Sequence, residues 1–236
     1  MLPLRAIRYL YPMRRLILCF LLLPFSLKAQ SLFQTEDNRV FFGGLTGGVN
    51  ISQVDGDALS GYHKIGFQGG AQVVARFSPY IGVGLELLYA QKGSLFKGFS
   101  EDAYANTYLE EYRLQLDYVS VPLLLHVFTP NRLSYHAGLS YDRLIRSKEE
   151  ITTPQAYLVL NPEAYPFRKN NFSLIGGIGY EFYRGWQVQA RYEYSLTSIR
   201  EGRYIPIGYG GGTFGGQYHN LFTFRLAYFF GGRQQG

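Results

Sequence analysis

From residue 40 onward the chain alternates between apolar and polar or small residues with a period of two, and no long stretch has the amphipathic period of a helix. Between Ile65 and Phe77, for example, every second residue is apolar or small, and most of the residues between them are polar or glycine. Successive side chains of a β-strand point to opposite faces of a sheet. The pattern predicts eight strands, at about 40–53, 64–78, 80–93, 112–128, 133–145, 171–183, 186–197 and 218–230.

The connections between these segments alternate in length. Tight turns are expected at Ser78-Pro79, at 129–131 and at Arg184-Gly185, whereas the links at 54–63, 94–111, 146–170 and 198–217 are long. In an up-and-down sheet, successive turns lie at opposite ends, so all short links fall at one end. This asymmetry predicts an all-β protein, an eight-stranded antiparallel up-and-down transmembrane β-barrel with short periplasmic turns and long extracellular loops.

The kind of polar residue indicates which face meets lipid, since a secreted lipocalin-like barrel would also alternate. The polar positions hold small and amide side chains with few charges, which favours a packed lumen over a surface in water. Aromatic residues on the apolar positions fall near strand ends, as in interfacial girdles; the alternative is an ordinary aromatic core. The predicted girdle residues are Phe77, Tyr89, Phe128, Tyr141, Phe172, Phe182, Trp186, Tyr194 and Phe230.

Charge and composition add a targeting segment. The chain of 236 residues has a net charge of +6, but five basic residues and no acidic one lie in residues 1–29, so the rest is nearly balanced and a nucleic-acid partner is not expected. A basic start, an apolar run at 16–23 and Ala29 predict a signal peptide (1–29), cleaved near Ala29. A retained anchor is the alternative, but the run is too short to span. A short periplasmic segment (30–39), the barrel domain (40–231) and a C-terminal tail (232–236) follow.

An eight-stranded barrel has an interior just wide enough for side chains to fill. The inward positions carry charges that must be paired when they are buried. We predict that salt bridges plug the lumen; a narrow pore for small solutes, lined by the same groups, is the alternative. The predicted network joins Arg76, Arg191 and Arg225 to Glu86, Glu181 and Glu193.

Three polar residues, Asp117, Arg143 and Asn220, fall on the apolar positions near the long-loop rim. If the hairpin around Pro130 pairs residues whose numbers sum to 260, Asp117 lies opposite Arg143 as a neutralising rim pair. The same register places Pro122 opposite Gly138. Because proline has no N–H for a neighbouring strand, we expect a bulge at Pro122.

Catalysis is a rival interpretation, because some outer-membrane barrels modify lipids or cleave peptides. Inward positions carry His126, His136, Ser134, Ser140 and Asp142, but the assumed register places His126 beside Ser134 and Asp142 several residues away. A Ser/His/Asp set needs all three groups within hydrogen-bond reach. We therefore expect these residues to be lumen hydrogen-bonders, and no catalytic residue, cofactor or metal site. The only cysteine, Cys19, lies in the leader.

Aromatic residues in the long links could bind partners or pack on one another above the barrel. These residues are Tyr104, Tyr108, Tyr157, Tyr165, Phe167, Tyr204, Tyr209 and Phe214, near a glycine-rich stretch at 208–216.

The segments Gly44–Asn50, Gly82–Tyr89, Leu116–Leu125 and Tyr135–Leu139, with the aromatic last strand, resemble the PorT-like family of outer-membrane β-barrel proteins across residues 40–231. The resemblance implies an eight-stranded barrel in a Gram-negative outer membrane, and its founding member takes part in type IX protein secretion. We interpret the chain as a monomeric barrel bound to outer-membrane lipid, non-enzymatic, and structural or accessory to surface assembly or protein secretion through its loops. A pore and a lipid- or peptide-modifying hydrolase remain the alternatives.

Overall fold

The computed structural model describes residues 40–56, 61–101, 107–153, 156–205 and 216–230. The compact unit that carries the strands begins at Phe41. The predicted signal peptide, the segment at 30–39 and the C-terminal tail lie outside the described residues and stay predictions.

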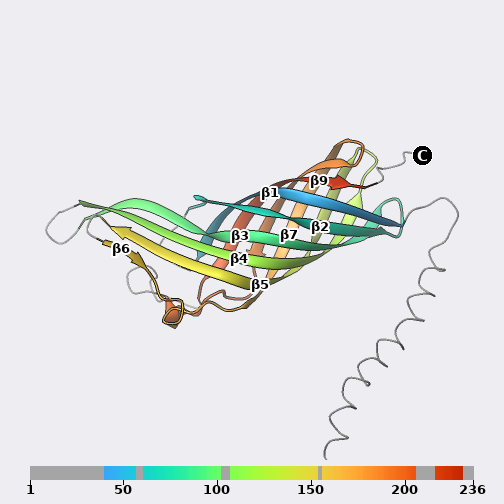
Figure 1. Ribbon diagram of the computed structural model, residues 1–236. Helices are drawn as coiled ribbons and strands as arrows, with labels where there is room; N and C mark the ends of the chain where they lie inside the picture. The colour runs from blue at the N-terminus through green and yellow to red at the C-terminus, as the bar shows by residue number, and fades with distance from the viewer. Residues whose placement is uncertain (1–39, 57–60, 102–106, 154–155, 206–215, 231–236) are drawn as a thin grey trace, which may run out of the picture. The chain divides into compact units, whose positions relative to one another are not determined.

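Antiparallel strands make up nearly all regular structure in the described residues (Figure 1). They are β1 (Phe41–Asp55), β2 (Lys64–Arg76), β3 (Ile81–Glu101), β4 (Thr107–Phe128), β5 (Leu133–Thr153), β6 (Ala156–Val159), β7 (Asn170–Tyr183), β8 (Trp186–Ser195) and β9 (Tyr218–Phe229), with a 3₁₀ turn, η2, at Gly202–Tyr204. Each of eight strands pairs with two neighbours, because β1 also pairs with β9 and β4 with β5. The predicted eight-stranded up-and-down barrel is confirmed, and β6 adds a short ninth strand beside β5.

Tight turns close the barrel at one end. The β7–β8 turn contains Gly185 at φ 78°, where a Cβ would lie 2.6 Å from the carbonyl oxygen of Phe229, so glycine suits this position. The β4–β5 turn places Arg132 at φ 63°, and the Thr129 N–H donates to the Leu133 carbonyl at 2.9 Å. The turn conformations set the register of the β7–β8 and β4–β5 hairpins.

The β4–β5 register differs from the predicted one. Residue numbers in paired positions sum to 262, because the turn runs through Arg132 and is centred one residue later than Pro130. Further along, Ile145 is an extra residue on β5, so Asp117 lies opposite Arg146. The predicted pairing of Asp117 with Arg143 is therefore wrong.

Pro122 lies opposite Ser140, and no register shift occurs there, so the bulge predicted at this proline is also wrong. Between β4 and β3, Leu123 and Ser120 are paired, but the two residues between them are not. The register of the two strands is the same before and after this gap. Because proline has no N–H to donate, the ladder is interrupted at this point without an inserted residue.

β3, β4 and β5 are much longer than predicted. β3 reaches Glu101 instead of ending at 93, β4 starts at Thr107 instead of 112, and β5 reaches Thr153 instead of 145. Most of the two links assigned as loops at 94–111 and 146–170 is thus β-structure. We call the part beyond the barrel the outer sheet: β3 from Gly93, β4 up to Asp117, β5 from Arg146, and β6.

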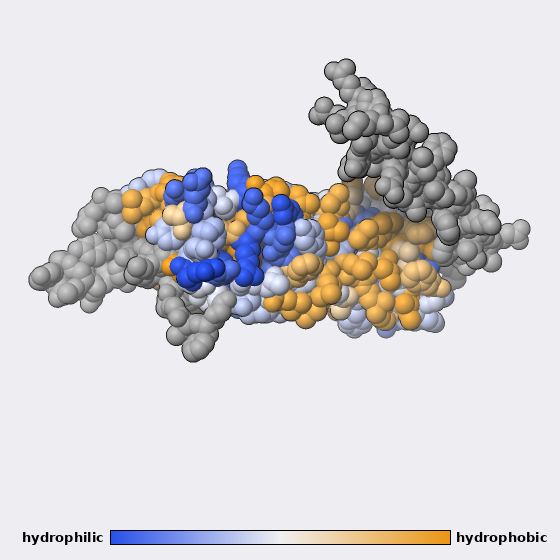
Figure 2. All heavy atoms as spheres, turned by 90° about the horizontal axis from the view of Figure 1, so that it is seen from below, coloured by the Kyte–Doolittle hydropathy of each residue, from blue (hydrophilic) through white to orange (hydrophobic). Residues whose placement is uncertain are grey.

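The apolar positions of the barrel strands point outward, as predicted. Phe67 is 65% exposed and Leu123 is 56% exposed, whereas Gln72, Ser140 and Thr223 are buried inside. Figure 2 shows hydrophobic residues gathered in a broad zone on this surface, beside a zone of hydrophilic residues. Of the described residues, none forms a helix long and apolar enough to span a membrane.

Candidate functional site

The lumen holds a carboxylate bound by two guanidinium groups. Glu86 on β3 accepts two hydrogen bonds from Arg191 of β8, at 2.7 and 2.9 Å, and two from Arg225 of β9, at 2.6 and 2.9 Å. Gln189 also accepts from Arg225 at 2.6 Å. Bidentate Arg–carboxylate pairs are the stronger kind of ionic hydrogen bond. We call Glu86, Arg191 and Arg225 the lower ion cluster, because it lies nearer the tight turns.

A second cluster lies further toward the long loops. Lys92 on β3 donates to Asp142 of β5 at 2.9 Å and to Glu193 of β8. Asp142 also accepts from Ser140 at 2.8 Å and from Ser173 at 3.0 Å. We call Lys92, Asp142 and Glu193 the upper ion cluster.

The two clusters balance each other in charge. The lower cluster has one cation more than its anions, and the upper cluster has one anion more than its cations. Arg191 and Glu193 are two residues apart on the same face of β8, so the surplus charges lie on adjacent levels of the lumen. Buried ions are tolerated when they are paired in this way.

The structure brings together part of the predicted lumen network. Arg191, Arg225 and Glu86 meet, and Glu193 pairs instead with Lys92. Arg76 and Glu181 lie at the tight-turn end: Arg76 donates to the Pro79 carbonyl at 3.1 Å, and Glu181 accepts from the Gly185 N–H at 3.2 Å.

The predicted network omitted Lys92 and Asp142. Both alternate in phase with Glu86 and Ser140 on their strands, so their inward direction could be read from the sequence. Their partners could not, because Glu193 reaches Lys92 from β8, across the lumen from β3.

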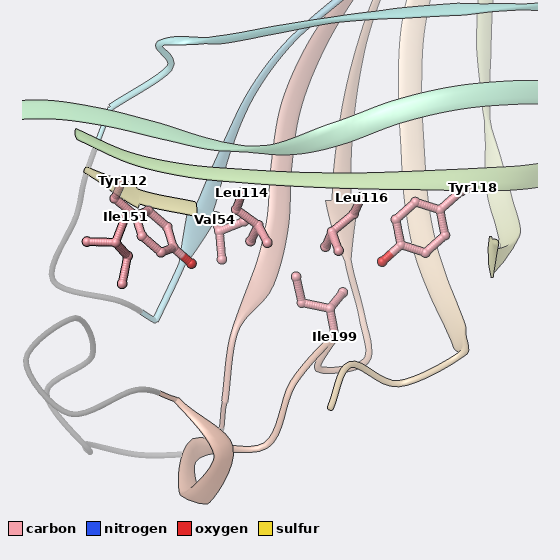
Figure 3. Packing of buried hydrophobic residues seen from close by; sticks show 7 residues of the cluster. All are labelled: Val54, Tyr112, Leu114, Leu116, Tyr118, Ile151 and Ile199. Carbon is pink, nitrogen blue, oxygen red and sulfur yellow. The ribbon is translucent and has the colours of Figure 1, made fainter. Parts of the chain in front are cut away.

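Above the upper cluster the interior becomes apolar. The Lys92 Nζ lies 5.4 Å from the centroid of the Tyr118 ring, and the Tyr118 hydroxyl lies 3.1 Å from His219 Nε2. Tyr118 is also the first member of a buried group that we call the apolar cap (Figure 3). It comprises Val54, Tyr112, Leu114, Leu116, Tyr118, Ile151 and Ile199.

A buried ion pair fixes the segments that cover this cap. Arg200, fully buried, donates to Glu149 on β5 through both terminal nitrogens, and the Tyr112 hydroxyl donates to the same carboxylate at 2.5 Å. The guanidinium also lies 3.6 Å from the centre of the Phe167 ring and donates to the Tyr165 carbonyl at 3.3 Å. Residues 165–167 and 198–200 are thereby held against the inner face of the outer sheet.

This packing bears on the aromatic residues predicted for the long links. Phe167 packs against the apolar cap, which supports the alternative that loop aromatics pack above the barrel. Tyr157 is exposed on β6, with its hydroxyl bound to Glu150, and Tyr204 lies in η2 beneath Arg203. Tyr108 lies in β4, while Tyr104, Tyr209, Phe214 and most of the glycine-rich stretch lie outside the described residues.

Most predicted girdle residues point outward from the barrel. Tyr194 is half-buried and its ring stacks on Tyr218. Phe128 is an exception, because it lies on the inward side of β4. Its ring stacks on His126 with the ring centroids 5.8 Å apart, and the Arg76 Cζ lies 4.1 Å from the centroid of the Phe128 ring. Phe128 shares the parity of His126, so its assignment to the lipid face was wrong. The exposed members are Phe77, Tyr89, Tyr141, Phe172, Phe182, Trp186 and Phe230.

The residues of the rival catalytic hypothesis do not converge. His126 lies opposite His136, and Ser134 lies opposite Phe128, with its hydroxyl 3.4 Å from the Gly179 carbonyl that it donates to. Asp142 belongs to the upper ion cluster.

The two histidines are also not arranged to share a metal ion. The Nε2 of His126 reaches toward Gly84 on β3, and that of His136 reaches toward Gly177 on β7, so the two atoms diverge. Within the described residues no group of three or more His, Cys, Asp or Glu side chains is placed to share a metal ion.

The polar residues at the long-loop rim find local partners. Arg146 Nε donates to Asp117 at 2.7 Å, and Arg143 donates to the Asn170 side chain at 2.5 Å. Asn220 donates to Asp55 at 3.0 Å and accepts from the Tyr62 hydroxyl at 2.6 Å. The polar side chains at the rim thus have hydrogen-bond partners on adjacent strands and in the link after β1.

Comparison with known proteins agrees with this architecture. Residues 29–201 match the family described as outer membrane protein beta-barrel domain. A comparison with curated proteins finds no match.

Among solved structures, the chain is similar to Ail, the attachment invasion locus protein of Yersinia pestis, at 14% identity and a TM-score of 0.47, over 81% of this chain and 100% of that chain. It is also similar to Neisserial surface protein A, at 8% identity and a TM-score of 0.43, over 80% of this chain and 97% of that chain. A third similar structure is that of the outer membrane protein AlkL, at 12% identity and a TM-score of 0.31, over 86% of this chain and 97% of that chain. Likeness at this level supports no statement about ligands or partners.

Because the match covers most of its length, the chain belongs to the outer-membrane β-barrel domain family. It is an integral protein of the outer membrane, and by the rule for such barrels its tight turns face the periplasm and its long links face outward.

Proposed function

We propose that this outer-membrane barrel is closed to solutes and holds the outer sheet at the cell surface, as a non-enzymatic structural or accessory component of surface assembly or protein secretion. The observation that carries the proposal is the filling of the lumen at three successive levels: the lower ion cluster, the upper ion cluster and the apolar cap.

The ion clusters suit a plug better than a channel lining. In a water-filled pore, charged side chains project into solvent, whereas Glu86 is 2% exposed, Lys92 1% and Arg225 4%. Each carboxylate is bound by charged or hydroxyl donors from other strands, which ties opposite walls of the barrel together. Removing one partner would leave uncompensated buried charge, which costs about 3–5 kcal/mol.

The cap closes the outer end independently. Leu114, Leu116 and Ile199 are fully buried, and the Arg200–Glu149 pair holds the covering segments in place. A solute would have to displace both the cap and the ion clusters to cross.

Conductance of the refolded chain in planar bilayers tests the closed lumen. We expect no stable current steps from the full-length protein. Stable open steps in the unmodified protein would refute the plug and support the narrow pore. The variant Glu86→Gln/Arg191→Gln removes one ion pair of the lower cluster and leaves Arg225 to balance the surplus anion of the upper cluster, and we expect it to stay closed because the upper cluster and the cap remain.

The accessory role depends on the outer sheet, and shortening this sheet tests it. Ser94 and Leu114 are paired, so a two-residue turn can join them and remove residues 95–113. We expect the shortened protein to reach the outer membrane at normal levels while cells show the surface-protein or secretion defect of a strain lacking the protein. Normal surface and secreted proteins with the shortened barrel, beside a defect in the deletion strain, would contradict a role for the outer sheet.

A further inference from the structure

The outward face of β5 carries a row of basic side chains directly above the apolar surface of the barrel. Tyr141 is the last outward aromatic residue of the strand, and the outward positions that follow are Arg143, Ile145, Arg146 and Lys148. At about 3.3 Å per residue, the row begins roughly 7 Å beyond Tyr141. Interfacial aromatic residues mark the level of lipid headgroups, so the row starts at that level and rises into the aqueous layer.

The cations in this row face solvent, and their carboxylate partners do not. The Arg146 side chain is 64% exposed, but its partner Asp117 is 2% exposed. Lys148 is 54% exposed, against 14% for Glu150. An approaching anion therefore meets the positive groups first.

Arg143 has no carboxylate partner among the described residues. Its guanidinium donates to the Asn170 side-chain oxygen, which also accepts from the Tyr141 hydroxyl at 3.0 Å. This shared acceptor orients Arg143 at the level of the aromatic ring. Arg146 donates to Asp117 through Nε, and its two terminal nitrogens carry four further N–H donors.

The extra residue on β5 brings an apolar group into the same row. Ile145 is 55% exposed, between the two arginines. An apolar side chain flanked by guanidinium groups matches the junction between acyl chains and a phosphorylated headgroup. Arginine forks are suited to phosphate oxygens, and anionic headgroups attract basic residues at a membrane surface.

We propose that the outward face of β5 from Arg143 to Lys148 binds phosphate groups on the sugar headgroup of glycolipid in the outer leaflet. The site is a rim of contact with surrounding lipid and needs no change in the barrel. Such binding fixes the height of the outer sheet above the membrane.

Titration of the full chain in phosphatidylcholine nanodiscs with lipid A tests the site, with dephosphorylated lipid A as the matched ligand and bound lipid counted by native mass spectrometry. We expect Arg143→Gln/Arg146→Gln to weaken binding of phosphorylated lipid A by about tenfold. The single variant Arg143→Gln, which keeps the Asp117–Arg146 pair, should show a smaller loss in the same direction.

The control is Lys97→Gln/Arg113→Gln, which removes the same charge from the same face about 20 Å further from the barrel along β4. This control should bind lipid A like the unmodified protein. Equal losses in both double variants would mean diffuse attraction and would overturn the site, as would equal binding of dephosphorylated lipid A. Binding of heparin in detergent that Arg143→Gln/Arg146→Gln abolishes, with no effect on lipid A, would assign the row to a soluble polyanion instead.

Discussion

The two halves of β4 use one backbone alternation with opposite chemistry. Between Val119 and Val127 the odd-numbered residues are apolar and face outward, and the even-numbered ones face the lumen. Between Glu111 and Asp117 the odd-numbered residues are charged or amide and still face outward, whereas Tyr112, Leu114 and Leu116 are buried inside. The strand does not turn over; its surroundings change from lipid to water.

The difference shows that burial, and not direction, decides where apolar residues go. In lipid, an outward leucine meets hydrocarbon and the lumen must satisfy polar groups. In water, the outer sheet needs a core like that of a soluble protein, and the apolar cap provides it. The chemistry reverses between Asp117 and Val119, on the level of the Asp117–Arg146 pair.

The largest effect is expected from an unpaired ion in the lumen. Glu86→Gln leaves Arg191 and Arg225 without a carboxylate, and we expect it to lower the free energy of unfolding by about 3–5 kcal/mol. Denaturant titration of the protein folded in lipid vesicles measures this loss. Glu150→Gln, which removes the partner of exposed Lys148, should cost less than about 1 kcal/mol. Similar losses in both variants would remove the distinction between lumen and surface.

Truncating a leucine should matter more in the cap than on the lipid face. Leu114→Ala opens a cavity in the apolar cap and should cost about 2–5 kcal/mol. Leu123→Ala should cost about half of that or less, because lipid fills the space that the side chain leaves. Hydrogen exchange of the outer sheet, with denaturant titration, separates the two. A larger loss for Leu123→Ala would contradict the assignment of the cap as a packed core.

Placing a charge on the outward face should distinguish the halves by depth. Leu123→Arg puts a guanidinium against hydrocarbon, and we expect a loss of about 2–4 kcal/mol in vesicles. Thr152→Arg, outward on β5 in the outer sheet, should change stability by less than about 0.5 kcal/mol. Tolerance of Leu123→Arg would mean that this face is not in lipid.

The smallest effect concerns an ion pair at the outer sheet. Hydrogen bonds from Arg113 and Lys97 hold the pKa of Glu111 below its ordinary value. Stability from this contact is therefore present above the ordinary glutamate pKa and is lost as pH falls through the lower, folded value. We expect hydrogen exchange in the outer sheet to quicken slightly over that acid range. Glu111→Gln should remove this pH dependence, and an unchanged profile in the variant would exclude Glu111 as its source.

The strand count, the tight turns and the outward apolar face could be predicted because each depends on local alternation and turn residues. The outer sheet was missed because the added parts of β3 and β5 carry few apolar residues, and because Tyr112, Leu114 and Leu116, although inside the predicted strand 112–128, are out of phase with the apolar positions of the barrel. Both phases were present in the sequence, but only one was expected.

Register and pairing across the lumen could not be predicted in the same way. The left-handed conformation of Arg132 moves the β4–β5 register, and the extra Ile145 moves it again, which places Arg146 and not Arg143 opposite Asp117. The partner of Lys92 is set by the level at which β8 crosses the lumen, a property of the closed barrel and not of any one strand.

An accessibility scan along β4 measures whether the outward face changes from lipid to water at Asp117. Spin labels at single cysteines, one at each position from 111 to 127 with Cys19 replaced, are read with oxygen and with a water-soluble nickel chelate as relaxants. We expect outward positions from Val119 to Val127 to favour oxygen and outward positions from Glu111 to Asp117 to favour the nickel chelate. Outward positions that favour the same relaxant along the whole strand would contradict the reversal at Asp117.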